Sequence, residues 1–316
     1  MLTRRDLVIG NALALTSCNR TSRLTLAVIP KANADLFFGS VREGASDAAR
    51  KNHVEMVWNG PDHETEYERQ IQIVDAMIAR RVDGLAISAT DDRALVGPLQ
   101  RARQAGIPLT IFDSAVQIED YVSLVATDNF GAGCMAARLL SQRLQGSRKV
   151  AMLMQKPGGT STELRERGFE ETLTREFPKL RIVAKQFGMG DHAKSMAAAE
   201  NILTAHPDLG GLFASSEACS IGAIRAIRSR QLSKRIRLIT FDASDTHIEA
   251  LRDGTADVML VQDAFRIGFE AVRSLTEKLS GRSPARRVDI PARAVTGADL
   301  NQPEVREFLR SLQLRW

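Results

Sequence analysis

The strongest constraint on the fold is an alternation that begins at Leu24 and continues almost to the end of the chain. Short runs rich in β-branched and aliphatic residues alternate with longer stretches whose apolar residues recur at helical spacing. In residues 38–51, for example, Val41, Ala45 and Ala48 recur at the intervals of one helix face. Strands that alternate with helices form parallel sheets covered by helices. The sequence therefore predicts an α/β fold with mostly parallel sheets.

This alternation runs through the chain twice. In the first half the predicted strands are residues 24–29, 54–58, 84–88, 109–112 and 123–126, and the predicted helices are 38–51 and 66–80. After Thr127 the predicted strands are 150–154, 182–187, 212–214, 238–241 and 258–261, and the predicted helices are 133–144, 163–176, 194–205, 221–230, 246–253 and 267–279. A chain of 316 residues is long enough for two domains. Because no proline-, glycine- or serine-rich linker separates the halves, we expect two lobes joined by short crossings.

The first residues differ from the rest of the chain. Arg4 and Arg5 precede a short, mostly apolar run over residues 7–15, and Thr16-Ser17-Cys18 follows. This order is typical of a signal peptide, and small residues before a cysteine resemble the bacterial lipobox. We therefore expect residues 1–18 to be a lipoprotein signal peptide, with lipid attached to Cys18.

Two further details bear on export. The arginine pair resembles a twin-arginine signal, and residues 19–23 are polar, as expected for a tether. The alternative is an ordinary buried first helix, but Asn11 interrupts the apolar run. We expect an exported protein of the periplasm or cell envelope whose contact with the membrane is the lipid anchor alone.

Composition and motif spacing argue against several other functions. The net charge is only +5 and its basic residues are scattered among acids, which argues against nucleic-acid binding. No glycine-rich turn follows the first predicted strand, which argues against a nucleotide enzyme. Cys134 and Cys219 are expected as buried thiols, and the five histidines show no metal-ligand spacing. We expect no enzyme activity, no cofactor and no metal.

Polar residues gather where the predicted strands end. In open parallel sheets ligands bind beyond the carboxyl ends of the strands, so these segments are the candidate binding residues. They are Pro30–Phe38, Ser88–Asp91, Asp113-Ser114, Arg165–Phe169, Ser215–Glu217, Phe241-Asp242 and Gln262-Asp263.

That set, in that order, resembles the ribose-binding family of periplasmic binding proteins, the type I sugar receptors of ABC transporters. The resemblance covers residues 24 to about 296. Its most specific pieces are Phe37-Phe38, Ile111-Phe112-Asp113, Ala126-Thr127-Asp128-Asn129, Arg165–Phe169, Leu203–Asp208 and Phe241-Asp242. It implies two Rossmann-like lobes with parallel sheets, a hinge of three crossings and a ligand in the cleft. We expect a first lobe of residues 24–126 plus 263–291 and a second lobe of 127–262 plus 292–316.

The resemblance also implies roles for single residues. Phe37 and Phe38 would stack on the apolar faces of a sugar ring. Hydroxyls both donate and accept hydrogen bonds, which suits carboxylates, a guanidinium and an amide. The residues expected to bind them are Asp113, Arg165, Asp242 and Gln262, with Ser88, Ser216 and Glu217 as further candidates.

Departures from the family pattern bear on the ligand. Family members that bind pentoses carry arginine where this chain has Ser114, asparagine where it has Ser88 and Ser216, and an aromatic residue near Gly190. Ribose is therefore in doubt, and the smaller side chains leave room for a bulkier sugar, a substituted sugar or a polyol.

Taken one at a time, these residues have other interpretations. Phe37 and Phe38 could be core contacts, and Asp113 and Asp242 could cap helices. Arg165 could pair with an acid on its own helix. Three neighbouring acids, Asp91, Asp92 and Asp128, are expected to cap helices. As an ordered set, the strand-end residues favour the cleft.

The predicted function is that of an extracytoplasmic solute-binding protein of an ABC importer, which binds a sugar or polyol in the cleft between the lobes. Its expected partners are the small molecule and the permease subunits of the transporter, and we expect a monomer. The alternative is a periplasmic sugar sensor whose closed lobes dock to a chemoreceptor or a histidine kinase.

Overall fold

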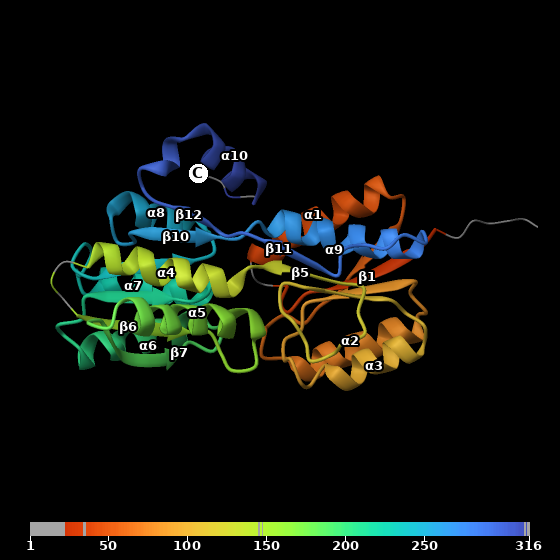
Figure 1. Cartoon of the computed structure of the whole chain (residues 1–316), viewed down its shortest axis with the longest axis horizontal. Coiled ribbons are helices and arrows are strands. Elements are labelled where there is room, and N and C mark those ends of the chain that lie inside the picture. Colours follow the sequence, from red (N-terminus) through yellow and green to blue (C-terminus); the bar gives the residue numbers. More distant parts are fainter. Residues whose placement is uncertain (1–22, 34–35, 145, 147, 313, 315–316) are drawn as a thin grey trace, which may run out of the picture.

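The computed structural model describes residues 23–33, 36–144, 146, 148–312 and 314, so the predicted signal peptide and Cys18 lie outside the described residues. The chain forms two α/β lobes side by side (Figure 1). The predicted fold class is confirmed: two lobes, each with its own sheet of mostly parallel strands.

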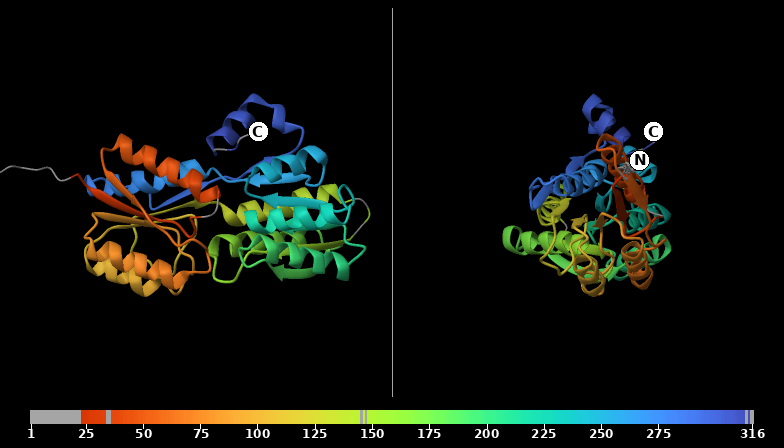
Figure 2. Two further views of the ribbon diagram at one scale, coloured as in Figure 1. Left: turned by 180° about the vertical axis from the view of Figure 1, so that it is seen from behind. Right: turned by 90° about the vertical axis from the view of Figure 1, so that its right-hand side faces the viewer.

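The first lobe is built on a six-stranded sheet in the order β11-β5-β4-β3-β1-β2, with every neighbouring pair parallel. Its strands are β1 (Thr25–Ile29), β2 (Glu55–Trp58), β3 (Gly84–Ile87), β4 (Leu109–Phe112), β5 (Ser123–Thr127) and β11 (Arg287–Ile290). Helices α1 (Leu36–Lys51) and α9 (Ala264–Leu279) cover one face, and α2 (Tyr67–Ala79) and α3 (Val96–Gln104) cover the other (Figures 1 and 2).

The second lobe repeats the plan, with its sheet in the order β12-β10-β9-β8-β6-β7. Its strands are β6 (Lys149–Met154), β7 (Arg181–Phe187), β8 (Gly211–Ala214), β9 (Arg237–Phe241), β10 (Val258–Val261) and β12 (Arg293–Val295), of which β12 alone runs antiparallel to its neighbour. Its helices are α4 (Asn129–Arg143), α5 (Thr160–Glu176), α6 (His192–Ala205), α7 (Glu217–Ser229) and α8 (Asp245–Asp253). Helix α4 packs against α5, and α6 packs against α7.

Most observed helices begin several residues before the predicted ones. Helix α4 begins at Asn129 rather than at residue 133, because Asp128 caps it: its carboxylate accepts from the backbone N–H of Gly131. Asp191 caps α6 in the same way, and Asp263 caps α9. Apolar spacing locates the buried face of a helix, whereas a polar cap decides where the helix begins.

Glycines let helices approach closely in both lobes. A Cβ atom on Gly44 of α1 would lie 1.8 Å from the carbonyl oxygen of Phe265, and one on Gly268 of α9 would lie 1.9 Å from that of Val41. In the second lobe, a Cβ on Gly133 would lie 2.0 Å from the carbonyl oxygen of Arg165. Any larger residue at these positions would push the helices apart, so the glycines fix where α1 and α5, and the predicted site residues that they carry, can lie.

The chain passes between the sheets three times: between β5 and α4, between β10 and α9, and between β11 and β12. The first two crossings are tied together, because Thr127 Oγ1 donates a hydrogen bond of 2.6 Å to Gln262 Oε1. After β12, a short 3₁₀ helix (Asp299–Asn301) and α10 (Pro303–Ser311) end the chain (Figure 1). This tail also contacts the first lobe, since Ser40 Oγ of α1 donates to the carbonyl oxygen of Leu312 at 2.8 Å. None of the helices described here combines the length and apolar character required to span a bilayer.

Candidate functional site

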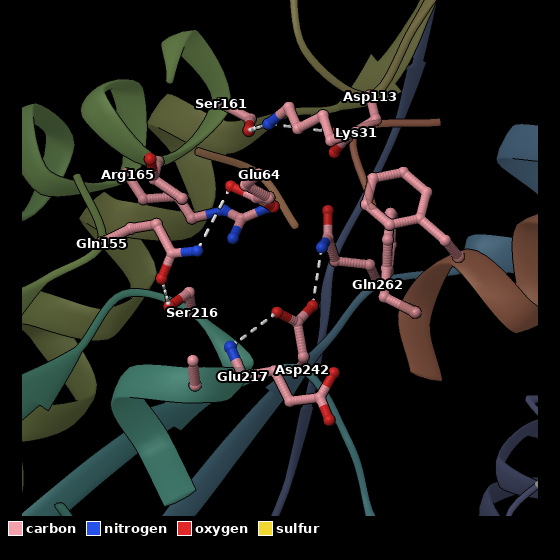
Figure 3. Close-up of a pocket in the computed structure, with 14 residues that line it drawn as sticks. Lys31, Glu64, Asp113, Gln155, Ser161, Arg165, Ser216, Glu217, Asp242 and Gln262 are labelled. Atoms are coloured by element: carbon pink, nitrogen blue, oxygen red, sulfur yellow. Dashed lines mark hydrogen bonds and ion pairs between the residues drawn. The ribbon is translucent and has the colours of Figure 1, made fainter. Parts of the chain in front are cut away.

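A cavity lies between the lobes, where the carboxyl ends of the two sheets face each other; the space there that atoms leave empty, open solvent included, is about 410 Å3 (Figure 3). Its lining from the first lobe is Lys31, Phe37, Phe38, Glu64 and Asp113; the second lobe adds Gln155, Ser161, Thr162, Arg165, Ser216, Glu217, Ala218 and Asp242; and Gln262 lies at a crossing. Because both lobes line the cavity, neither lobe alone forms the site.

Asp113 is the strand-end acid of the first lobe. It follows β4 directly and is 5% exposed. Its Oδ2 accepts a hydrogen bond of 2.7 Å from Ser88 Oγ and lies 3.4 Å from the ammonium nitrogen of Lys31. Lys31 also reaches the other lobe, since its Nζ donates to Ser161 Oγ at 3.1 Å. Ser88 itself does not line the cavity, so its predicted role changes to holding Asp113 in place.

Asp242 is the corresponding acid of the second lobe, after β9. Its Oδ1 accepts from Gln262 Nε2 at 2.6 Å, and its Oδ2 accepts from the backbone N–H of Glu217 at 3.1 Å. Burial raises the pKa of Asp242, while the positive charge of Arg165 acts in the opposite direction. Asp242 does not cap α8, the helix that follows it, but its carboxylate accepts from the first backbone N–H of α7, so the helix-cap interpretation holds for a neighbouring helix.

Arg165 extends from α5 and is only 2% exposed. Its Nε donates to Asn129 Oδ1 at 2.7 Å, one Nη donates to the carbonyl oxygen of Ser215 at 3.0 Å, and the guanidinium lies 3.8 Å from the ring centre of Phe241. Burial lowers the pKa of Arg165, and the acids Asp242 and Asp113 oppose that shift. The interpretation of Arg165 as a solvated helix face paired with Glu163 or Glu166 is therefore wrong.

A buried network supports the wall of the second lobe. Gln155 Oε1 accepts from the hydroxyl of Ser216, and Gln155 Nε2 donates to Glu64 Oε2 of the first lobe at 3.3 Å. Beneath them, one oxygen of Glu166 accepts from the backbone N–H of Gln155 at 3.1 Å and from Ser215 Oγ at 2.7 Å. Burial raises the pKa of Glu166 to about 7. The network fixes the ends of β6 and β8 relative to each other.

Phe37 and Phe38 form the aromatic side of the cavity. Their ring centres lie 5.0 Å apart and their planes meet at 81°. Phe38 is 2% exposed and belongs to the hydrophobic core, whereas Phe37 is half-buried and packs against that core. The core interpretation is thus confirmed for Phe38, which also lines the cavity, while stacking on a sugar ring stays a prediction.

The lobes also touch beyond the cavity. Lys156 Nζ donates to the carbonyl oxygen of Thr90 at 2.7 Å, and Thr160 Oγ1 donates to that of Ala115 at 3.1 Å. The backbone N–H of Asp92 donates to the carbonyl oxygen of Gly158 at 3.3 Å. Through these contacts the two lobes meet directly beside the cavity. This is the closed arrangement of the lobes.

The structure brings together every predicted site residue except Ser88, although their role as ligand contacts stays a prediction. The lining residues to which the sequence analysis assigned no role are Lys31, Glu64, Gln155, Ser161, Thr162 and Ala218. Lys31 lies within the strand-end segment Pro30–Phe38 that the sequence suggested, and Gln155 follows β6 directly, so the same rule could have found it. Glu64 lies in a loop where no strand end or motif indicated a site residue.

Two predictions about neighbouring residues were tested as well. Among the three acids expected to cap helices, Asp128 does so, and Asp91 accepts from the N–H groups of Arg93 and Ala94 in the turn before α3. Asp92 does not cap a helix, because its carboxylate accepts from the Gln117 side chain at 2.7 Å. Cys134 and Cys219 are buried free thiols, as predicted. The part of the chain that the structure describes holds no cluster of three histidine, cysteine or acidic residues suited to a metal.

Comparisons with known proteins agree with this architecture. Residues 26–283 match the periplasmic binding protein domain family. The ribose import binding protein RbsB of Bacillus subtilis is 29% identical over 260 residues, which are 82% of this chain and 83% of that protein. A solute-binding protein of an ABC transporter from Agrobacterium vitis, solved with bound alpha-D-tagatopyranose, is 27% identical with a TM-score of 0.87, over 90% of this chain and 99% of that one.

A second solute-binding protein from Agrobacterium vitis, solved with bound D-fucose, is 29% identical with a TM-score of 0.86, over 89% of this chain and 98% of that one. The family match spans most of the chain, and the two solved structures cover 90% and 89% of it. This chain therefore belongs to the periplasmic binding proteins, in their type I arrangement of two α/β lobes.

Proposed function

We propose that this protein is an extracytoplasmic solute-binding protein that holds a sugar or a polyol between its lobes and delivers it to an ABC importer. The observation that carries the proposal is the placement of Asp113 and Asp242, one from each lobe, with Arg165 at a single buried cavity. Two fixed acceptors and one fixed donor on opposite walls suit a ligand that carries hydroxyls on several sides.

The chemistry of the lining supports a polyhydroxylated ligand. Each hydroxyl donates one hydrogen bond and accepts others, and the cavity offers carboxylates, a guanidinium, amides and hydroxyls. Phe37 adds a partly exposed aromatic surface for the C–H face of a ring. The relatives named above are described as binding ribose, alpha-D-tagatopyranose and D-fucose, which favours the same ligand class here.

Ligand binding in this proposal requires the lobes to close. We propose that the hinge lies where the chain passes between the sheets, which gives a first lobe of residues 24–126 plus 263–291 and a second of 127–262 plus 292–316. An open form would leave each wall with unmatched partners, so the ligand shifts the population toward the closed form. A sensor would use the same closed form, but the descriptions of the solved relatives as parts of ABC transporters favour an importer.

The proposal includes export and lipid attachment at Cys18, as a monomer. The sequence pattern of residues 15–18 supports the anchor, and the family supports a location outside the cytoplasm.

A thermal-shift screen tests the ligand class directly. The panel contains D-ribose, D-arabinose, D-allose, D-galactose, D-glucose, D-fucose, D-tagatose and xylitol. A ligand present at 100 times its Kd stabilises the folded protein by about 2.7 kcal/mol, which moves the melting temperature measurably. At least one member should do so, and no shift with any member would contradict the proposal.

Alanine variants then locate the site. Asp113→Ala, Arg165→Ala and Asp242→Ala should each weaken binding about 10- to 100-fold in calorimetric titration, because hydrogen bonds to charged groups contribute roughly 1.5–3 kcal/mol. The matched control is Asp75→Ala, which removes an exposed acid paired with Arg101 on the surface of the first lobe. If all three site variants fold and bind like the control, the ligand binds elsewhere.

A further inference from the structure

Lys31 belongs to a strand-end segment that the sequence suggested, but its side chain was given no role, and its surroundings are unusual for a lysine. It lies two residues after β1, is 2% exposed, and ends inside the cavity (Figure 3). Lysine is seldom fully buried unless its charge is paired. Here the ammonium has two partners from different lobes: Ser161 Oγ at 3.1 Å and Asp113 Oδ2 at 3.4 Å.

Counting donors and acceptors shows what these partners leave unused. An ammonium group has three N–H donors; within the described part of the chain Lys31 donates to Ser161 Oγ and forms an ion pair with Asp113 Oδ2. The Oδ2 of Asp113 accepts from Ser88 and pairs with Lys31, while its Oδ1 has no donor among the described residues. Both residues line the cavity, so as far as the described residues go a donor of Lys31 and an acceptor of Asp113 are left for a ligand there.

A hydroxyl group fits this pair, because it can accept from Lys31 and donate to Asp113 Oδ1 at the same time. Charged substituents fit poorly. A carboxylate or phosphate would lie against Asp113, and a protonated amine would lie against Lys31; either way, like charges would be held together in a buried site. A hydrogen atom or a methyl ether in place of the hydroxyl would leave Asp113 without a donor.

The residue after Asp113 carries no positive charge, so the cation beside Asp113 comes from Lys31, which is distant in the sequence. Ser114 carries no charge, and its Oγ accepts from the backbone N–H of Ser161 at 3.4 Å. Lys31 thus supplies the positive charge from the turn after β1. A lysine offers a point charge with single N–H donors, whereas an arginine offers a planar fork that engages two oxygens at once. A lysine at this position therefore donates to a single oxygen atom of the ligand.

We propose that Lys31 and Asp113 together recognise one free, uncharged hydroxyl of the ligand, and that Lys31 thereby determines which sugars the cavity accepts. This inference rests on the proposed function. The same ammonium also donates to Ser161 of the second lobe, so the hydroxyl would bind beside a contact between the lobes.

The experiment pairs changes in the protein with changes in the ligand. The probe is the tightest-binding member of the sugar panel above, together with its monodeoxy and mono-O-methyl derivatives. Calorimetric titration is done with the wild type, Lys31→Met and Ser161→Ala. In the wild type, removal of one particular hydroxyl should weaken binding about 10- to 100-fold. In Lys31→Met, which already binds the parent sugar more weakly, removal of that same hydroxyl should cost less than about threefold.

Ser161→Ala is the matched control, because it removes the contact between lobes but leaves the ammonium beside Asp113. It should weaken the binding of every sugar and derivative by a similar factor. The loss of affinity caused by removing each hydroxyl should stay as in the wild type. If Lys31→Met also preserves that pattern, Lys31 only joins the lobes and the inference is overturned while the proposed function stands. If no panel member binds the wild type, the proposed function fails and the inference fails with it.

Loss of the charge could also unfold the protein, since Asp113 would lose its cation. Lys31→Gln, which keeps a neutral donor of similar length, provides a second variant, and thermal unfolding without ligand checks both. If both variants fail to fold, Lys31 is a structural residue and the inference is overturned. If Lys31→Gln folds and shows the reduced loss for the same hydroxyl, the inference is supported.

Discussion

Asp113 and Asp242 occupy corresponding positions in the two lobes and share a left-handed backbone, with φ values of 56° and 66°. Each follows its strand directly, and each backbone N–H donates at 2.8 Å to the neighbouring strand, to the carbonyl oxygen of Val125 or of Leu260. A left-handed backbone is unfavourable for residues other than glycine, although aspartate tolerates it better than most. Both lobes thus place a carboxylate at the cavity at the cost of local backbone strain.

The strain predicts an unusual order of stabilities at residue 242. Asp242→Gly and Asp242→Ala both remove the carboxylate, but only the alanine variant retains the cost of the left-handed backbone. The glycine variant should therefore be more stable by about 1 kcal/mol in urea denaturation. The control is Glu171, an exposed residue within α5, where glycine should be less stable than alanine by about 1 kcal/mol. Equal stabilities of the two residue-242 variants would show that the backbone is not strained.

Glu166 predicts a pH dependence. Its pKa is about 7 in the folded protein against an ordinary 4.5, so between these values the folded state retains a proton that the unfolded state has lost. Stability should fall as pH rises from 4.5 to 7, by up to about 3 kcal/mol, and then level off. Glu166→Gln removes this effect and keeps the acceptor, because one oxygen accepts both hydrogen bonds of Glu166.

The measurement is urea denaturation of the wild type and Glu166→Gln at pH 5 and pH 8. The stability of the variant relative to the wild type should be greater at pH 8. His247, whose pKa burial lowers to about 4, destabilises the fold as pH falls below 6.5, but both proteins contain it and its effect cancels in the comparison. The same relative stability at both pH values would contradict the prediction.

Lys156 is predicted to stabilise the closed form without touching the ligand. It is 7% exposed, and its ammonium donates to Thr90 in the other lobe. Lys156→Met should shift the unliganded protein toward an open form, seen as a larger radius of gyration in small-angle scattering. Lys185→Met, which removes a surface ion pair with Glu170 inside the second lobe, should leave the radius unchanged. An identical radius for both variants would mean that Lys156 does not hold the lobes together.

The predicted anchor is tested by Cys18→Ala. Without the thiol no lipid can be attached, so the exported protein should move from the membrane fraction to the soluble fraction. The wild type should incorporate radiolabelled palmitate and the variant should not. A wild-type protein that is soluble after export and carries no label would show that Cys18 is not an anchor.

Hydrophobic periodicity was sufficient to predict the central elements of the fold. Strands β4 and β10 were predicted with their observed bounds, because each is a fully buried apolar run. Strands β11 and β12 and helices α3 and α10 were not predicted. The two strands are short and carry charged residues such as Arg287 and Arg293, so they lack the apolar signal of a buried strand.

The candidate site was predictable where residues sit at strand ends, as Asp113 and Asp242 do. Sequence could not show that Ser88 acts through Asp113, or that Lys31 folds back into the cavity, because both depend on side-chain directions set by the packed lobes. Glu64 reaches the site from a loop after β2, and its position depends on contact with Gln155 of the other lobe. Such contacts arise only once both lobes exist.

The place of β11 in the first sheet has a consequence for folding during synthesis of the chain. This strand comes from residues 287–290, yet it pairs with β5 at the edge of a sheet whose other strands end at residue 127. Helix α9, which covers that sheet, also follows strands β6 to β10 of the second lobe in the sequence. A chain that emerges from its amino end therefore makes five of the six strands of the second lobe before α9 and β11 of the first. Until then one face and one edge of the first sheet lack their cover, and an uncovered edge strand is a site of aggregation.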